Sequence, residues 1–157
     1  MSQSQLAAVL GRVPSGLFIL TTAYKGTETG MLSSWVMQAG FEPPTVSVAL
    51  QKDRLVARWL SAGAAFVLNV LREDQKSLLS HFGRGFSEGE NAFKGLDLNR
   101  TKSGLPLLPD SLGHLECHPQ SHVDSGDHRV FLATILSGHM AADRQPYVHI
   151  RKNGLRY

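Results

Sequence analysis

The sequence has 157 residues, with 42% hydrophobic and 18% charged residues, which is the length and balance of one globular domain. Its net charge of +3 comes from scattered Lys and Arg without a basic stripe, so the composition argues against a nucleic-acid partner. A single cysteine, Cys117, excludes an internal disulfide framework. With no basic leader and no apolar run of membrane length, we expect a cytoplasmic protein that does not contact a membrane.

In chain order, the pattern predicts a helix from Ser4 to about Arg12 and then a β-branched, aromatic strand over 16–24. The following stretch MLSSWVMQAGFEPP, residues 31–44, is apolar like a strand but contains two adjacent serines and ends in a double proline. Because neighbouring strand residues face opposite sides, one of these serines must face the apolar side. The stretch is therefore unusual enough to suggest a role beyond packing.

Further along, strands are predicted over 45–51 and 65–71, with a helix between them that Asp53 caps and Gly63 ends. A third helix is expected from Asp74 to about Phe82. The polar, glycine-rich segment 83–104 is expected to be a functional or mobile loop, since loops of this length are uncommon inside compact domains. Strand character then returns over 112–123, 127–140 and 147–152.

These elements predict a mainly β fold: a six-stranded antiparallel barrel with flanking helices, formed by a single domain over 1–157. Three strands (16–24, 65–71 and 129–137) are apolar on both faces. In a barrel this requires packing on the outer wall as well, so we expect a homodimer or a bound ligand to cover it.

Two short motifs resemble catalytic or metal sites without the required context. HLECHPQSH places His114, His118 and His122 four residues apart, but four residues of a strand span roughly 13 Å, too far for ligands of one metal. GFSEG at 85–89 matches the G-x-S-x-G pattern of hydrolases but lies in a polar loop rather than between a strand and a helix. No metal site is therefore predicted. Neither nucleotide-binding glycine motif is present, so a nucleotide would have to bind in another way.

Three further places are candidates for ligand binding. Lys52 and Arg54 flank Asp53 where a strand gives way to a helix, which suits an anion, although a plain capped helix with solvated basic neighbours explains them as well. Ser33 and Ser34 could donate to the same ligand or mark a strand end or bulge. His128 follows the turn residues Gly126 and Asp127, as an exposed hairpin residue or as an imidazole at the rim of a site.

A local cluster of Arg151, Lys152 and Arg156 lies near the end of the sequence. Such a cluster is typical of a solvated surface, but it would also suit a small anionic ligand.

Taken together, the motifs GMLSSW, FEPPTVSVALQKDR, FVLNVL, LEC, GDH and HIRKNGxxY, in this order, resemble the flavin reductase-like domain, the FMN-binding split barrel. In particular they are similar to the C-terminal flavin reductase module of flavodiiron proteins from oxygenic phototrophs. The similarity extends from about Leu6 to Tyr157. It implies a split β-barrel homodimer that binds FMN, with FAD as the alternative flavin, near the subunit interface and uses NADH or NADPH as co-substrate.

The resemblance also implies which residues contact the flavin. The first group is Met31, Leu32, Ser33, Ser34 and Trp35, and the second is Ala49, Leu50, Gln51, Lys52 and Arg54, with Lys52 and Arg54 near the phosphate. His128 occupies the position of the GDH motif, where the family contacts the nicotinamide or the flavin. Many family members have small hydroxyl residues where this chain has Trp35, Asp53 and Arg54.

The function that the resemblance implies is an NAD(P)H:FMN oxidoreductase that passes electrons to a flavodiiron module or another acceptor. The alternative is a flavin-binding or haem-binding split-barrel module without reductase activity, acting as an electron relay or sensor. Segment 83–104 is then a candidate cover for the pocket. Trp35 either covers the flavin or packs under the following helix.

Overall fold

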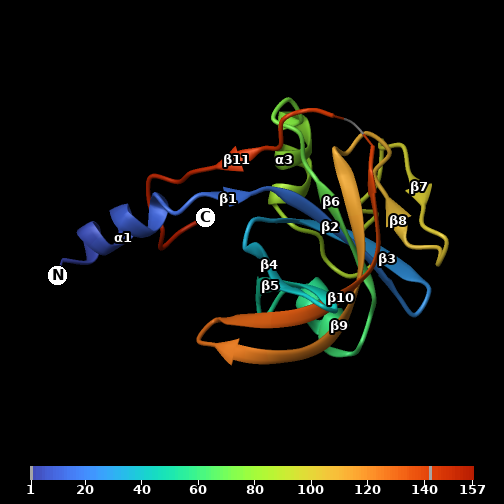
Figure 1. Ribbon diagram of the computed structural model, residues 1–157, viewed down its shortest axis with the longest axis horizontal. Helices are drawn as coiled ribbons and strands as arrows, with labels where there is room; N and C mark the ends of the chain where they lie inside the picture. Colours follow the sequence, from blue (N-terminus) through green and yellow to red (C-terminus); the bar gives the residue numbers. More distant parts are fainter. Residues whose placement is uncertain (1, 142) are drawn as a thin grey trace.

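Antiparallel strands dominate the computed structural model, which describes residues 2–141 and 143–157 (Figure 1). Within this described part, seven strands form one sheet in the order β3-β2-β6-β9-β10-β5-β4. Their bounds are β2 (Phe18–Tyr24), β3 (Thr27–Ser33), β4 (Val36–Phe41), β5 (Pro44–Gln51), β6 (Phe66–Val70), β9 (Gly113–Ser125) and β10 (His128–Met140). The mainly β, antiparallel split-barrel class predicted from the sequence is confirmed.

The strand count differs from the prediction because the stretch over 31–44 is not one strand. It contains the end of β3, which is one edge of the sheet, and the whole of β4, which is the other edge. Ser34 and Trp35 join the two edges, and the carbonyl of Trp35 accepts a hydrogen bond from the Ala49 N–H at 3.0 Å. A chain that passes directly from one edge to the other curls the sheet into a barrel whose edge strands are joined by this segment. The double proline contributes to the hairpin between β4 and β5, where Phe41 pairs with Pro44.

Two apolar clusters lie on the two sides of the sheet. Inside the barrel, Leu20, Val48, Leu68 and Phe131 pack against the helix α2 (Leu55–Ser61), which contributes Val56, Ala57 and Leu60. Outside it, strand residues such as Ile19 pack against Phe82 of the helix α3 (Lys76–Gly83). The two-sided apolar strands are thus covered, at least over β2, by the protein's own elements.

Segment 83–104 has a role in this second cluster. Its residues Ala92 and Phe93 are buried there, with Ala92 fully inaccessible. A short ribbon of β7 (Asn99–Arg100) and β8 (Pro106–Leu107) follows, and Arg100 forms an ion pair with Glu28 of β3 at 2.5 Å. The segment is therefore a largely exposed loop that is anchored to the core through Ala92 and Phe93.

The helix starts differ from those expected. Ser2, rather than Ser4, caps α1 (Gln3–Gly11), with its side chain accepting from the Gln5 N–H at 3.4 Å. At α2 the capping residue is Arg54, in an extended conformation and without a side-chain cap, so the expected Asp53 cap is wrong. The start of α3 likewise lies at Lys76, after Gln75 instead of Asp74.

The two ends of the described chain form a projection, here called the arm, that comprises residues 3–16 and 148–157. In it α1 leads into β1 (Ser15–Gly16), which pairs with β11 (Val148–His149). Figure 1 shows the arm extending from one side of the barrel, with the end of the chain folded back beneath α1. Among the described residues, no helix has the length and apolarity needed to cross a membrane.

Candidate functional site

A cavity of about 570 Å³ opens between the barrel and the arm. Its barrel side is formed by the end of β3, the Ser34–Trp35 junction and the end of β5, and its other side by residues 149–157 of the arm. The volume lies within the range of small-molecule and cofactor sites, which is about 300–1,000 Å³. Nine of the eleven residues expected to bind or act on a flavin line it: Met31, Leu32, Ser33, Ser34, Trp35, Ala49, Leu50, Gln51 and Arg54.

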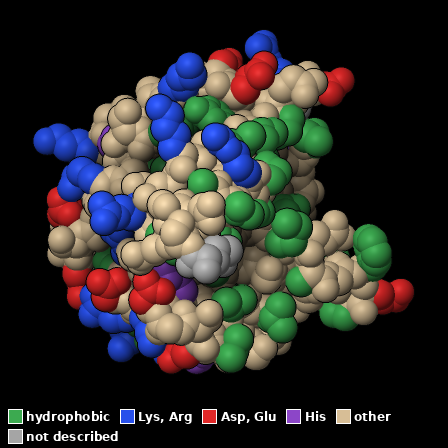
Figure 2. All heavy atoms as spheres, turned by 90° about the vertical axis from the view of Figure 1, so that its left-hand side faces the viewer, with side chains coloured by type: hydrophobic (Ala, Val, Ile, Leu, Met, Phe, Trp, Pro, Cys, Tyr) green, Lys and Arg blue, Asp and Glu red, His purple; other side chains and the backbone are tan. Residues whose placement is uncertain are grey.

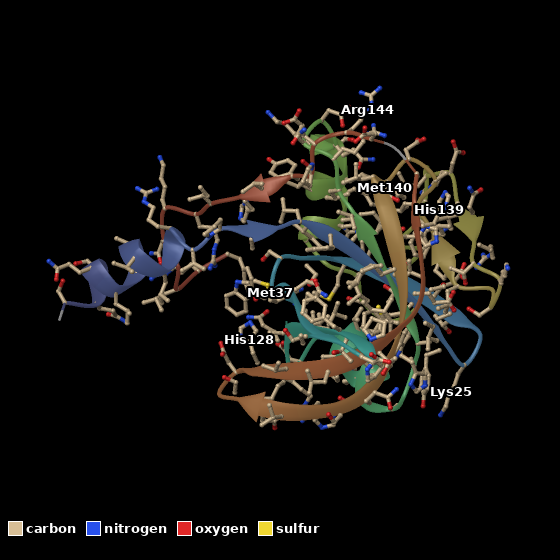
Figure 3. All side chains as sticks on the ribbon, in the orientation of Figure 1. Lys25, Met37, His128, His139, Met140 and Arg144 are labelled. Atoms are coloured by element: carbon tan, nitrogen blue, oxygen red, sulfur yellow. The ribbon has the colours of Figure 1, made fainter. Side chains whose placement is uncertain are left out.

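The two remaining expected residues are placed differently. Lys52 does not line the cavity, and its ammonium lies 3.9 Å from the Asp124 carboxylate. His128 does not line it directly either, but its ring lies 4.7 Å from that of Trp35, which does. Figure 3 shows His128 on the side of the barrel from which the arm extends.

His128 is held by partners on both ring nitrogens. Its Nδ1 lies 2.8 Å from the Asp127 carboxylate, and its Nε2 lies 2.7 Å from the Tyr157 hydroxyl. The hydrogen bond from His128 lowers the pKa of Asp127, so the carboxylate is ionised and accepts the Nδ1 proton. In the neutral imidazole, Nε2 is then the acceptor for the Tyr157 O–H. The pKa of that phenol is raised, chiefly by partial burial, so it remains a donor at neutral pH.

Trp35 lies at the centre of an aromatic group at the cavity. Besides His128, it contacts the ring of Tyr157 at 5.8 Å and has the guanidinium of Arg151 over its face at 5.4 Å. These separations are typical of tilted aromatic pairs and of cation–π contacts. Of the two alternatives for Trp35, packing under the following helix is not what these contacts show, because the ring packs against the arm and His128.

Ser33 and Arg54 provide polar groups that a ligand could use. The Ser33 hydroxyl is buried and has no hydrogen-bond partner within the described residues, although it lines the cavity. A buried hydroxyl without a partner is costly and favours a ligand that bonds to it. Arg54 has a side-chain hydrogen bond to Gln51 at 3.3 Å, which leaves most of its donors available.

The arm contributes residues that the sequence did not place in the site. Seven of them line the cavity: His149, Ile150, Arg151, Lys152, Asn153, Arg156 and Tyr157. The sequence marked the three basic ones as a cluster that suits an anion, but gave no sign of what they would face. Tyr157 was visible only as part of a motif.

The histidine motif of β9 provides no site in this structure. Among residues 2–141 and 143–157, no group of three His, Cys, Asp or Glu side chains is placed to hold a metal ion. Cys117 is fully buried in the barrel core, where burial raises the pKa of its thiol to about 12. It therefore acts as a small core residue.

Comparison with known proteins identifies the family. The model of the flavin reductase like domain matches residues 10–155, nearly the whole sequence. The chain belongs to the flavin reductase-like family. A flavin fits the donor set of the cavity, since apolar strand residues suit a ring system, the unpartnered Ser33 hydroxyl suits its polar edge, and Arg54 suits a phosphate.

The curated relatives of this flavin reductase-like chain include longer cyanobacterial proteins. It is 39% identical over 157 residues to diflavin flavoprotein A 1 of Synechocystis sp. and 36% identical over 156 residues to putative diflavin flavoprotein A 3 of Nostoc sp.. Each match covers 98% of this chain but 27% of the relative, so the chain spans about a quarter of the length of these proteins. It corresponds to their C-terminal region.

Solved structures agree with this assignment. The NADH:FAD oxidoreductase SgcE6 of Streptomyces globisporus superimposes with a TM-score of 0.87 at 25% identity, covering 95% of this chain and 89% of that one. The same enzyme in complex with NAD and FAD fragments gives a TM-score of 0.83. The flavin reductase PheA2, at 21% identity and a TM-score of 0.81, supports the fold alone.

Proposed function

We propose that this chain is an NAD(P)H:flavin oxidoreductase that binds FMN in the cavity between barrel and arm. When bound, the flavin accepts a hydride from the nicotinamide and a proton from solvent, and later releases two electrons to an acceptor. The observation that supports this most directly is the convergence of nine expected flavin contacts on one cavity of about 570 Å³. The related enzyme SgcE6 has been solved in complex with NAD and FAD fragments, which supports a nicotinamide co-substrate for this chain and leaves FAD as the alternative flavin.

The residues divide the work in the following way. Met31, Ala49 and Leu50 give the flavin ring an apolar wall, and the Ser33 hydroxyl donates to its edge. Arg54 neutralises the flavin phosphate. His128, whose ring is fixed by Asp127, orients the nicotinamide at the mouth of the cavity without serving as an acid or a base.

One experiment tests this function. The purified protein is incubated with FMN or FAD, desalted, and titrated with NADH and with NADPH under argon while the flavin absorbance is followed. We expect stoichiometric flavin, loss of its visible absorbance on addition of at least one nicotinamide, and recovery when oxygen is admitted. A protein that retains neither flavin, or whose bound flavin neither nicotinamide reduces, contradicts the proposal.

The alternative is a flavin- or haem-binding module that acts as an electron relay or sensor without reductase activity. The contact that favours it is the hydrogen bond of Tyr157 to His128, because it occupies the nitrogen that would face a nicotinamide. This alternative predicts a bound cofactor that dithionite reduces and neither nicotinamide reduces. The titration above therefore separates the two functions.

A homodimer is also proposed, on the basis of exposed apolar side chains. Phe41 is 88% and Met37 65% exposed on the edge strand β4, and Leu136 of β10 is 59% exposed. Figure 2, which looks onto the side of the arm, shows hydrophobic side chains spread over that face as well. Sedimentation of the wild type and of Phe41→Asp tests this, with a shift from dimer to monomer expected in the variant.

The acceptor of the electrons is proposed from the curated relatives. Because the chain corresponds to a quarter of the diflavin flavoproteins, we propose a flavodiiron-type module as its acceptor. Stopped-flow mixing of the reduced protein with the remaining part of such a relative should reoxidise the flavin anaerobically. A reduced flavin that oxygen reoxidises but this module does not would contradict the proposed acceptor.

A further inference from the structure

The end of the chain, residues 151–157, is fixed to α1 within the arm by close backbone contacts. The Gly154 N–H donates to the Ala7 carbonyl at 2.7 Å, and the Arg151 N–H donates to the Gly11 carbonyl at 2.9 Å. Both glycines are in close contact with the opposite segment: a Cβ on Gly11 would lie 2.5 Å from the Arg151 carbonyl oxygen, and one on Gly154 would lie 2.6 Å from the Gly11 nitrogen. Residues 151–157 are thus held in a defined position at the mouth of the cavity.

The Lys, Arg, Asp and Glu side chains among the described residues that line the cavity are all positive. Arg54, Arg151, Lys152 and Arg156 line the cavity, and the lining includes no Asp or Glu among the described residues. None of the four forms an ion pair with a described carboxylate. Four cations around one cavity create a positive potential that attracts a ligand with several negative charges.

Within the arm, the three cations have different surroundings. Arg151 is partly buried, donates to the Arg156 carbonyl at 3.2 Å and lies over the Trp35 ring. Lys152 and Arg156 are exposed, and their side chains make no hydrogen bond to any described residue. Arg151 therefore has a structural partner, while Lys152 and Arg156 present their full charge at the mouth.

We propose that Lys152 and Arg156 form an anion subsite that binds the phosphates of the hydride donor. The inference rests on the proposed function. It assigns the binding of the flavin phosphate and the binding of the dinucleotide phosphates to two different parts of the protein. Arg54, next to the deep barrel wall, serves the flavin that stays bound, whereas the exposed arm residues serve the dinucleotide that enters and leaves in each cycle. Arg151 is a positioning residue that holds the Arg156 backbone.

The test compares donors with and without phosphates. The holoprotein loaded with FMN is assayed with the better of NADH and NADPH, and with 1-benzyl-1,4-dihydronicotinamide, which has the reacting ring but no phosphate. In the double variant Lys152→Gln/Arg156→Gln, we expect kcat/KM for the dinucleotide to fall about tenfold or more, mainly through KM, because two charge-assisted contacts are lost. For the benzyl donor we expect a change of less than about twofold, because it made no such contact.

A control variant removes the same charge elsewhere. Lys25 and Arg144, which Figure 3 shows away from the arm, do not line the cavity. Lys25→Gln/Arg144→Gln should retain wild-type kcat/KM with both donors. In the wild type, kcat/KM for the dinucleotide should fall with ionic strength, and this dependence should be weaker in the Lys152/Arg156 variant but not in the control.

Several outcomes would overturn the subsite. They are an equal loss with both donors, an unchanged kcat/KM for the dinucleotide, and a weakened affinity for FMN in the double variant, which would assign these cations to the flavin. Failure of the proposed function itself is separable, because it appears as a wild-type flavin that no nicotinamide reduces. In that case titration of the wild type and the double variant with NADP⁺ by calorimetry decides the subsite, which requires weaker binding in the variant.

Discussion

Substitution of Gly154 by alanine should release the end of the chain, residues 151–157, from α1 and so from its place at the cavity. The added Cβ would overlap the Leu10 Cβ and lie 2.6 Å from the Gly11 nitrogen, so the two segments cannot keep their present contact. The hydrogen bonds of the Gly154 and Arg151 N–H groups would be lost with it. At about 0.5–1.5 kcal/mol each, they stabilise the attachment of residues 151–157 to α1 by about 1–3 kcal/mol, a factor of about 5–150 in population.

The main unfolding transition should change little in this variant. Neither the cluster inside the barrel nor the cluster under α3 includes residues of 3–11 or 148–157. We therefore expect the free energy of unfolding of the barrel to fall by less than about 1 kcal/mol, because no core cavity is created.

Two measurements report directly on the position of residues 151–157. Trp35 loses the Tyr157 ring and the Arg151 guanidinium on undocking, so its fluorescence, isolated in a Trp59→Phe background, should change in intensity and wavelength. In the reductase assay, KM for the dinucleotide should rise about as much as in the Lys152/Arg156 variant. Gly11→Ala, which introduces a Cβ 2.5 Å from the Arg151 carbonyl oxygen, should act in the same way.

Unchanged Trp35 fluorescence together with an unchanged KM would contradict this prediction, since residues 151–157 would then remain attached to α1 despite the added methyl group. A loss of more than about 3 kcal/mol in the main transition would refute it differently, by showing that the arm belongs to the core. Ala8→Ser, on the exposed side of α1, is the matched control for these variants and should behave as the wild type.

Three further predictions concern the site and its support. His128→Ala should leave flavin bound but slow its reduction by about tenfold, since losing the proposed contact of His128 with the nicotinamide costs about 1.4 kcal/mol in the transition state; equal rates in rapid mixing would remove His128 from the mechanism. Asn69→Leu should lower the free energy of unfolding in urea by about 2–4 kcal/mol, because the fully buried amide bonds the Ile19 carbonyl and the Leu108 N–H, and a loss below 1 kcal/mol would contradict this. The hydrogen bond from Arg100 lowers the pKa of Glu28 below 4.5, so this ion pair stabilises the fold fully above pH 4.5 and the stabilisation is lost as pH falls through the lowered pKa. In Glu28→Gln, the melting temperature should therefore fall less steeply at acid pH than in the wild type. Parallel acid limbs in the two proteins would exclude this ion pair as a source of the pH dependence.

The sequence predicted the fold class well because its signals are local. Alternating or two-sided apolar runs mark β5, β6 and β10 within one residue or so of their true bounds, since each run reports its own burial. The helix caps were less predictable. Asp53 has the right residue type for a cap, but it lies in a turn over 52–53, and the extended residue that precedes the helix is Arg54. Residue propensity does not reveal at which of these neighbouring positions the helix begins.

The paired serines show what a local pattern leaves open. Their spacing marked the stretch as an unusual strand with a role beyond packing, yet it did not indicate that the stretch divides into two strands at opposite edges of the sheet. Strand order is set by packing between distant segments, and the closure at Ser34 and Trp35 follows from it. With that closure known, the buried Ser33 hydroxyl at the end of β3 becomes intelligible as a donor that faces the cavity.

The role of the arm could not be predicted from the sequence either, because it also depends on packing between distant segments. The cluster of Arg151, Lys152 and Arg156 was visible as charge, but its direction depends on the pairing of β1 with β11 and on the contact between Gly11 and Gly154. Together they bring the end of the chain to the cavity, so that the barrel forms one side of the lining and the arm the other. In the proposed function one nucleotide stays bound while another is exchanged, and the two sides offer separate cations for them, Arg54 on the barrel and Lys152 and Arg156 on the arm. The Gly154 and Lys152/Arg156 variants test the division from its structural and chemical sides.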